Sequence, residues 1–325
     1  MNSEPLPPTG LIRLQPLYME RVWGGRMLES LYGRHLPDPK VPFGESWEVV
    51  DRPDEQSVVH GGPLSGMTLN ELWTTRRKEI FGANAPDSER FPLLIKILDA
   101  RDKLSIQVHP PAAVAAGMGG EPKTEMWYIV DAEPGASLYA GVKPGVTPES
   151  FADALRDGTV EDAVPCLPVK EGDFIFIPSG RLHAIGAGLL IFEIQQNSDT
   201  TYRVFDWNRV GLDGKPRALH VEESLRCIDF SDTDPVLGEA QSGGVLVTCE
   251  YFTVRRRSAT AGQTLSLGKS GDFQMLGLVS GRLETATGAL RPGDWALIPA
   301  NLGDTARHAL GGPDEVVWLE VTFPG

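Results

Sequence analysis

One short string of the chain alternates polar and apolar residues and could carry metal chemistry. In LSIQVH, residues 104–109, every second side chain is polar. On a β-strand this pattern places Ser105, Gln107 and His109 on one face. Imidazole nitrogen and amide oxygen are both metal ligands, so the string predicts part of a metal site. The alternative is an exposed strand whose polar face meets water.

Two further strings could complete such a site. In KTEMWY, residues 123–128, Lys123 and Glu125 share one side of a predicted strand, and His183 follows a Pro-Ser-Gly turn. Two imidazoles, a carboxylate and an amide oxygen would form a mixed nitrogen and oxygen site suited to zinc or another divalent first-row metal. Positions would remain open for water or substrate. The residues alone also permit a second interpretation, a surface strand with unrelated polar neighbours.

Short strands, with a few helices around them, must position these side chains. Capping residues predict helices that begin after Thr68, with Glu71 closing a capping box, and after Thr147, with Gly158 as the stop. A third helical stretch is expected near 221–228. Apolar runs bounded by turn residues predict strands at 93–98, 104–108, 125–130, 173–177 and 189–195.

The C-terminal part of the chain contains an echo, which is a repeat of the residue spacing of an earlier segment. After a polar linker at 231–244, the sequence consists almost entirely of predicted strands and turns. The spacing from Gly293-Asp294 to Pro299 repeats the spacing from Gly172-Asp173 to Pro178. Asp304 falls where His183 stands in the first copy. The echo therefore predicts a second barrel of the same type without metal ligands.

Composition excludes several classes of protein. The 325 residues carry a net charge of −14, which argues against a nucleic-acid partner. Three widely spaced cysteines predict neither a disulfide framework nor a thiolate zinc site, and they indicate a reducing compartment. No basic leader precedes an apolar core, and no apolar run is long enough to span a membrane. We expect a cytoplasmic protein with no membrane or nucleic-acid partner.

Longer strings of the sequence carry a family resemblance. The order Gly172, five residues, Pro178-x-Gly180-x-x-His183 resembles the second motif of the cupin superfamily. Over roughly the first 230 residues the chain resembles the mannose-6-phosphate isomerases, in particular the short bacterial form of the cupin-type enzymes. The matching strings are WGG at 23–25, GESWE at 44–48, FPLLIKILDA at 91–100, LSIQVHP at 104–110, KTEMWYIVDA at 123–132 and PSGRLHAIGAGLLIFEIQQNSDTTYR at 178–203.

The resemblance implies a role for each candidate side chain. It implies a single divalent metal ion, zinc in the family. The metal ligands carried over are Gln107, His109, Glu125 and His183. The catalytic arginine corresponds to Arg203, and Lys123 is a candidate for proton transfer or for phosphate contact. Lys96 and Ser105 match positions that line the family's substrate pocket.

The fold and the activity follow from the same resemblance. It implies a mainly β protein with two cupin-like jelly-roll barrels and a few helices in and around the first. A catalytic domain would span 1–235 and a domain without metal ligands 236–325. The implied activity is interconversion of mannose 6-phosphate and fructose 6-phosphate through an enediol(ate), by a monomer or homodimer with a phosphosugar as its partner. The alternatives are another metal-dependent cupin enzyme acting on a sugar and a non-catalytic sugar-binding regulator.

Overall fold

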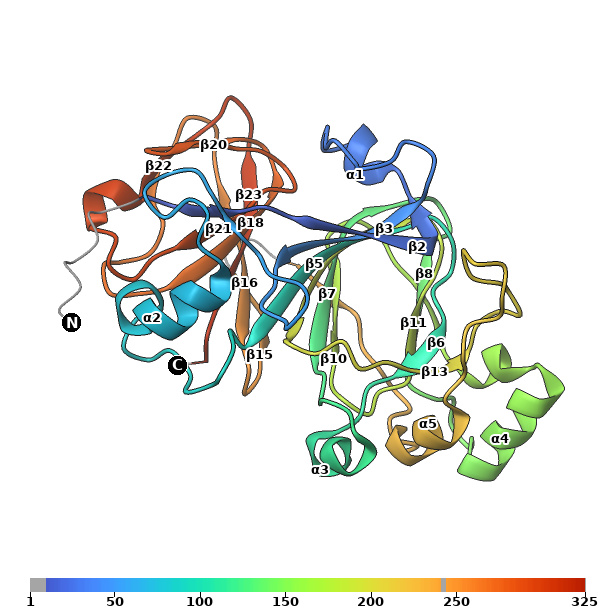
Figure 1. Cartoon of the computed structure of the whole chain (residues 1–325). Coiled ribbons are helices and arrows are strands. Elements are labelled where there is room, and N and C mark those ends of the chain that lie inside the picture. Colours follow the sequence, from blue (N-terminus) through green and yellow to red (C-terminus); the bar gives the residue numbers. More distant parts are fainter. Residues whose placement is uncertain (1–9, 241–243, 325) are drawn as a thin grey trace. The chain divides into compact units, whose positions relative to one another are not determined.

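The structure is a computed structural model that describes residues 10–240 and 244–324 (Figure 1). Its described residues form two compact units, and each unit is built from separate stretches of chain. Unit 2 comprises Tyr18–Ser46 and Ile95–Glu239. Unit 1 is formed by the described residues of Met1–Leu17, Trp47–Leu94 and Ala240–Gly325.

Unit 2 contains the strands that carry the predicted metal ligands. Over the described residues, its larger sheet has the strand order β14 (Gly238–Glu239), β10 (Asp173–Ile177), β7 (Glu125–Ala132), β12 (Leu189–Gln196), β5 (Leu93–Ala100), β2 (Leu17–Gly25) and β3 (Phe43–Val49). The smaller sheet has the order β13 (Tyr202–Phe205), β6 (Ile106–Val108), β11 (His183–Ile185), β8 (Ser137–Ala140) and β9 (Cys166–Pro168). The two sheets face each other, with β7 and β10 opposite β6 and β11 (Figure 1).

Short helices connect the strands of unit 2. They are α1 (Met27–Ser30), α3 (Ala112–Ala115), α4 (Pro148–Asp157) and α5 (Val221–Cys227), with 3₁₀ turns η1 (Ala116–Met118) and η2 (Val160–Ala163). At the start of α4, the Thr147 hydroxyl accepts from the backbone N–H of Ser150, and the Ser150 hydroxyl donates to the backbone carbonyl oxygen of Thr147. Gly158 ends the helix in a left-handed conformation, as predicted.

Unit 1 has a similar organisation. Its larger sheet, over the described residues, has the order β15 (Val245–Thr248), β16 (Thr253–Ala259), β23 (Val316–Thr322), β18 (Gln274–Ser280), β21 (Trp295–Ile298), β1 (Ile12–Leu14) and β4 (Val59–His60). The smaller sheet has the order β17 (Thr264–Ser266), β22 (His308–Gly311), β19 (Leu283–Thr285) and β20 (Gly288–Leu290). Helix α2 (Leu69–Phe81) starts with the predicted Thr68–Glu71 capping box, and η3 (Asp304–Arg307) is a single 3₁₀ turn.

Each of the two units has an apolar core of its own. Between the sheets of unit 2, the side chains of β7, β10 and β12 pack around Trp127, Ile175 and Ile191. Unit 1 packs its own strands around Leu276, Leu283 and Ile298. Each core removes most of its aliphatic surface from water, which is the main stabilising contribution for such sheets.

The strand registers of the two units correspond. In unit 2, Glu125 on β7 lies opposite Ile177, and Trp127 lies opposite Glu193. In unit 1, Gln274 on β18 lies opposite Ile298, and Leu276 lies opposite Glu320. The sequence echo thus coincides with equivalent strands, β10 and β21. After these two strands the units differ, because Asp304 begins the turn η3 in unit 1 whereas His183 begins strand β11 in unit 2.

The sequence predicts the elements better than it predicts the boundaries of the compact units. The mainly β class is confirmed, and β5, β7, β10 and β12 begin at the predicted residues. The compact units are divided differently from the predicted domains 1–235 and 236–325, because segments 10–17 and 47–94 belong to the unit that contains the C-terminal strands. The two domains themselves stay a prediction. The jelly-roll description of the units stays a prediction. No helix in the described residues is long and apolar enough to cross a membrane.

Candidate metal centre and adjoining pocket

Strand pairing in unit 2 brings the predicted ligands to one place. On the smaller sheet, Gln107 of β6 lies directly opposite His183 of β11 on one side and Arg203 of β13 on the other. His109 follows the end of β6. Glu125 begins β7 in the larger sheet, so it reaches the same space from the opposite layer.

Three of these side chains form a compact, buried cluster. The ligand atoms of His109, Glu125 and His183 all lie within 4.8 Å of one another. Nε2 of His109 is 3.6 Å from Oε2 of Glu125, and Nε2 of His183 is 3.6 Å from Oε1 of the same carboxylate. All three side chains are buried. These separations place two nitrogens and a carboxylate around a common point.

The orientation of the imidazoles suits a divalent cation. His109 donates from Nδ1 to the carbonyl oxygen of Thr200 at 2.8 Å, and His183 donates from Nδ1 to that of Arg181 at 2.8 Å. Both Nε2 atoms therefore turn a lone pair toward Glu125, which is how metal-binding histidines are usually fixed. Among the described residues, Nε2 of His109 and both carboxylate oxygens of Glu125 accept no well-directed hydrogen bond. Such buried, unsatisfied acceptors fit a metal ion.

Gln107 stands beside the cluster. Its amide nitrogen donates to Nε2 of His183 at 3.3 Å, and its amide oxygen accepts from the Ser105 hydroxyl at 3.2 Å. A half-turn of the amide group would bring the oxygen to the side of the cluster. Gln107 is therefore close enough to be a fourth ligand, and Ser105 contacts it directly.

Burial and charge pairing set the protonation of the cluster. Burial lowers the pKa of His183 to about 3 and also lowers the pKa of His109, with Lys123 acting in the same direction on His109. Burial alone would raise the pKa of Glu125, but the neighbouring Lys123 and the two histidines hold it well below its usual value. The site thus presents neutral imidazoles and a carboxylate, which are the forms that bind metal.

A pocket of about 570 Å³ in unit 2 adjoins the cluster. The predicted residues Lys96, Ser105, Gln107, Lys123 and Arg203 all line it. A volume of this size accommodates a small polar molecule. The structure therefore brings every predicted site residue either into the buried cluster or onto the wall of the adjoining pocket.

Lys123 joins the cluster to the pocket. Its Nζ lies 2.8 Å from Oε2 of Glu125 and 3.6 Å from Oε1 of Glu193. Burial alone would lower the pKa of Lys123, but these two carboxylates raise it above its usual value. The ammonium group is thus held in place by charge on both sides.

Glu193 is a pocket residue for which the sequence predicted no role. It is buried, and its Oε1 lies 3.3 Å from Nζ of Lys96, while the Trp127 indole donates to its Oε2 at 3.2 Å. Burial raises the pKa of Glu193. Its signal in the sequence is a single acid inside the apolar run LLIFEI, because a charged group in a buried strand needs a partner.

Arg203 presents part of its guanidinium to the pocket. Its Nη1 donates to the carbonyl oxygen of Ala218 at 3.0 Å, while its buried Nε has no hydrogen-bond partner among the described residues. Burial lowers the pKa of Arg203, and nearby Arg217 adds to this effect. Asp206 is occupied by Arg209 and Arg217, so it does not orient Arg203 through a direct contact.

The Trp-Gly-Gly string at 23–25 has a structural role in this unit. A Cβ atom on Gly24 would lie 2.3 Å from the backbone nitrogen of Gly44, and one on Gly25 would lie 2.5 Å from the Asp99 carboxylate. Asp99 accepts from the backbone N–H of Met27 at 2.5 Å. Burial nevertheless raises the pKa of Asp99 to about 6. The glycines permit a close approach that places a buried carboxyl at the start of α1.

Comparison with known proteins identifies the family of the chain. Residues 11–133 match the family model described as phosphomannose isomerase type I, catalytic domain. The chain is 41% identical over 249 residues to the probable mannose-6-phosphate isomerase GmuF of Bacillus subtilis, covering 74% of this chain and 77% of the relative. It is 35% identical over 300 residues to the mannose-6-phosphate isomerase of Streptococcus mutans, covering 88% and 92%.

A solved structure shares both sequence and fold with the chain. The crystal structure of the mannose 6-phosphate isomerase from Bacillus subtilis superposes with a TM-score of 0.83 at 31% identity. The match covers 95% of this chain and 99% of the solved one. The likeness therefore extends over both compact units and is not limited to the metal cluster.

Proposed function

We propose a metal-dependent sugar isomerisation for this chain, which belongs to the type I phosphomannose isomerase (mannose-6-phosphate isomerase) family of aldose–ketose isomerases. The substrate pair would be mannose 6-phosphate and fructose 6-phosphate. Their interconversion moves a hydrogen between the first two carbons of the open-chain sugar. We place this reaction in the pocket of unit 2 beside His109, Glu125 and His183.

The metal is proposed from the donor set. His109, Glu125 and His183 would hold a divalent ion, with Gln107 as a fourth ligand, and zinc suits this mixture of nitrogen and oxygen. When bound, the ion would supply Lewis-acid stabilisation of the negative charge that develops on a carbonyl oxygen. The carbonyls of Thr200 and Arg181 hold the two imidazoles in the required tautomer.

The chain's own cations have distinct proposed tasks. Removal of a proton beside a carbonyl gives an enediol(ate), and Arg203 would stabilise its negative charge electrostatically, because a guanidinium remains protonated. Lys123 lines the pocket and touches Glu125, so it can serve proton transfer or phosphate contact. Lys96 and Ser105 are proposed substrate contacts, with Lys96 held by Glu193.

One observation carries the proposal. Three buried ligand groups turn acceptor atoms toward a common point, and these acceptors have few protein partners among the described residues. A sugar-binding regulator without chemistry would not need this costly arrangement, because unsatisfied buried acceptors destabilise a fold. The adjoining cationic residues favour a phosphorylated substrate over the neutral sugar of another cupin enzyme.

Purified, zinc-loaded protein tests the proposal in an assay that couples fructose 6-phosphate formation to a dye. We expect turnover of mannose 6-phosphate. His183→Ala should lose metal and turnover together, whereas Arg203→Ala should retain metal and lose about a hundredfold or more in kcat, the scale for removing one electrostatic group. His308→Ala, an exposed histidine in unit 1, is the matched control. Absence of turnover by the zinc-loaded wild type would reject the isomerase assignment.

The remaining structural expectations are part of the same proposal. We describe each unit as a cupin-like jelly roll on the basis of its two sheets and the matching strand registers. The protein would work in the cytoplasm as a monomer or homodimer. Sedimentation of the purified protein at micromolar concentration would distinguish the two oligomeric states.

A further inference from the structure

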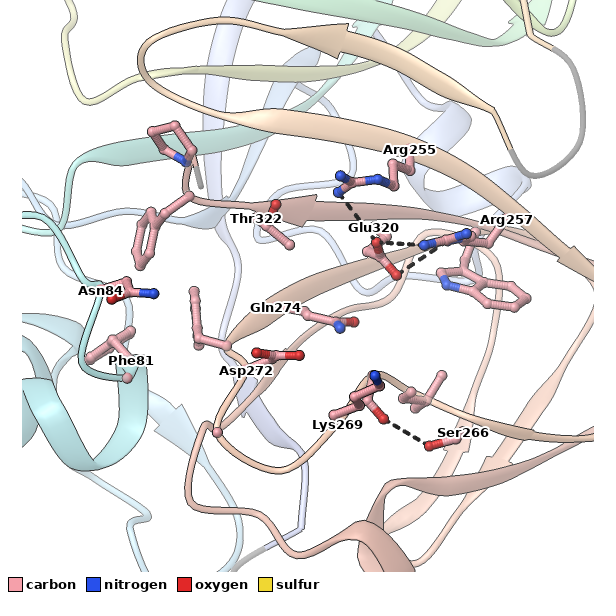
Figure 2. Close-up of a pocket in the computed structure, with 18 of the residues that line it drawn as sticks. Phe81, Asn84, Arg255, Arg257, Ser266, Lys269, Asp272, Gln274, Glu320 and Thr322 are labelled. Carbon is pink, nitrogen blue, oxygen red and sulfur yellow. Dashed lines mark hydrogen bonds and ion pairs between the residues drawn. The ribbon is translucent and has the colours of Figure 1, made fainter.

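A second cavity lies wholly within unit 1. Its volume is about 890 Å³, within the range of small-molecule sites. Figure 2 shows its polar side chains arranged around one open space, with Gln274 near the centre and Glu320, Asp272 and Lys269 around it. Neither the proposed reaction nor the metal cluster uses this cavity.

The cavity occupies a place equivalent to the pocket of unit 2. Gln274 has the register of Glu125, and Glu320 has the register of Glu193. Arg255 on β16 pairs with Glu320 on the neighbouring β23, as Lys96 on β5 pairs with Glu193 on the neighbouring β12. Unit 1 thus retains the ion pair of the substrate pocket at equivalent strand positions.

The metal chemistry is missing from this second place. An amide stands in the position of the carboxylate Glu125, and the metal-type cluster found among the described residues lies in unit 2. Next to Gln274, the buried guanidinium of Arg307 donates to the backbone carbonyls of Leu302, Leu267, Asp272 and Pro299. A fixed protein cation therefore adjoins the amide, and the cavity is suited to binding without conversion.

Two polar groups on the cavity wall have no side-chain partner among the described residues. Gln274 is only 7% exposed, lines the cavity, and its side chain makes no hydrogen bond to any described residue. The ammonium group of Lys269 is exposed and likewise has no ion pair within residues 10–240 and 244–324. An amide that opens onto a cavity and has no protein partner is able to hydrogen-bond a ligand or water there.

The charges of the cavity favour an anion. Arg255, Arg257 and Lys269 face two acids, Asp272 and Glu320. Arg257 makes the closer contact with Glu320, at 3.1 Å, whereas Arg255 lies 3.6 Å away with 32% of its side chain exposed. Lys269, which lies on the other side of Gln274 from Arg255 (Figure 2), can therefore contact a phosphate. Such local cations matter in a chain whose net charge is −14.

We propose that the cavity of unit 1 binds a phosphorylated sugar and does not convert it. Lys269 would contact the phosphate, while Gln274 and Asp272 would hydrogen-bond the hydroxyl groups. Phe81 and Phe273, which line the same cavity, offer apolar surface to the carbon skeleton. The choice of a sugar rests in part on the proposed function, because equivalent positions line the proposed substrate pocket.

Calorimetric titration with sorbitol 6-phosphate tests this inference. This probe has a phosphate and hydroxyl groups but no carbonyl, so it cannot be isomerised. We expect two binding events per zinc-loaded chain. Lys269→Ala should weaken one of them about tenfold or more and leave the other, together with the isomerase kcat/KM, within twofold. Lys78→Ala, an exposed lysine of α2 outside the cavity, is the matched control.

The outcomes separate this inference from the isomerase assignment. A single binding event that Lys269→Ala does not alter would overturn it while leaving the isomerase intact. Equal affinity for inorganic phosphate would also overturn it, because the hydroxyl contacts would then contribute nothing. Gln274→Leu provides a second variant, expected to weaken sorbitol 6-phosphate more than phosphate. If turnover is absent but the Lys269-dependent event persists, the isomerase assignment fails and the second site stands.

Discussion

The two units place different groups at equivalent strand positions. Unit 2 has Glu125 with two histidines whose Nε2 atoms face it, whereas unit 1 has Gln274 beside the guanidinium of Arg307. In one unit a buried carboxylate pairs with Lys123 and faces two imidazoles, and in the other a buried cation donates to several backbone carbonyls. The same strand layout can therefore provide either a cluster of potential metal ligands or a closed structural contact.

The two units differ in particular side chains and not in their strand registers. The backbone registers alone do not distinguish the units, since Glu193 and Glu320 occupy corresponding places. The distinction arises from two features. One is the charge of the side chain at equivalent positions of β7 and β18, which is Glu125 or Gln274. The other is the element that follows the proline-containing turn after β10 or β21. Where that element is a strand it presents His183, and where it is a 3₁₀ turn it presents Arg307.

Glu125→Gln gives unit 2 the amide that unit 1 has, and it should have the largest effect. The neutral amide removes the anionic ligand between the two histidines, so we expect loss of bound zinc and a decrease in kcat/KM of about a thousandfold or more. Elemental analysis and the coupled assay measure the two effects. Glu133→Gln, an exposed acid of unit 2, should change neither; full activity of Glu125→Gln would contradict the proposed metal site.

Arg307→Met removes the built-in cation of unit 1. Its buried guanidinium donates to the carbonyls of Leu302, Leu267, Asp272 and Pro299, which would lose these partners. We expect the free energy of unfolding in urea to fall by about 3 kcal/mol, the scale for stranding buried polar groups. Arg282→Met, on the exposed hairpin of the same unit, should change it by less than about 0.5 kcal/mol. Equal losses for both variants would show that Arg307 has no special structural role.

Asp99→Asn should have a smaller, pH-dependent effect. Unit 2 buries this carboxyl three residues after Lys96, where the corresponding place after Arg255 holds Ser258. Because burial raises the pKa of Asp99 to about 6, the folded state holds the proton more tightly than the unfolded state. The stability contribution of Asp99 is therefore present below about pH 4 and lost as the pH rises to 6.

The expected measurement is a difference in unfolding free energy between Asp99→Asn and wild type. This difference should increase in favour of the variant by roughly 2 kcal/mol between pH 4 and pH 7, because asparagine does not titrate. Urea unfolding at several pH values checks it. A difference that stays constant across this range would mean that the folded and unfolded states share the same Asp99 pKa.

Most local elements could be predicted from the sequence because their signals are local. The Thr68 cap, the Gly158 stop and the run from Asp173 to Ile177 each depend on neighbouring residues only. The compact units could not be predicted in this way. Ile12 pairs with Leu297, and no residue near Ile12 indicates a partner so distant in sequence.

For the site, too, local signals could be predicted from the sequence, whereas contacts between residues distant in sequence could not. The alternation around Gln107 and His109 and the turn before His183 predict side chains on particular strands, and the structure brings them together. The partners of Lys96 were not predicted, because opposing strands supply Glu193 and Glu45. Gln274 and Arg307 were missed because one amide and one arginine among strands have no distinctive spacing.

The pairing of β1 with β21 has a consequence for biosynthesis. At ribosomal rates of roughly 5 to 20 residues per second, Arg13 waits on the order of 15 to 60 s for Ala296 to be made. The segments of unit 2 are complete well before that time. During this interval the edge of β1 that pairs with β21 is unprotected, so we expect nascent chains arrested before β21 to be a preferred target of chaperones and proteases.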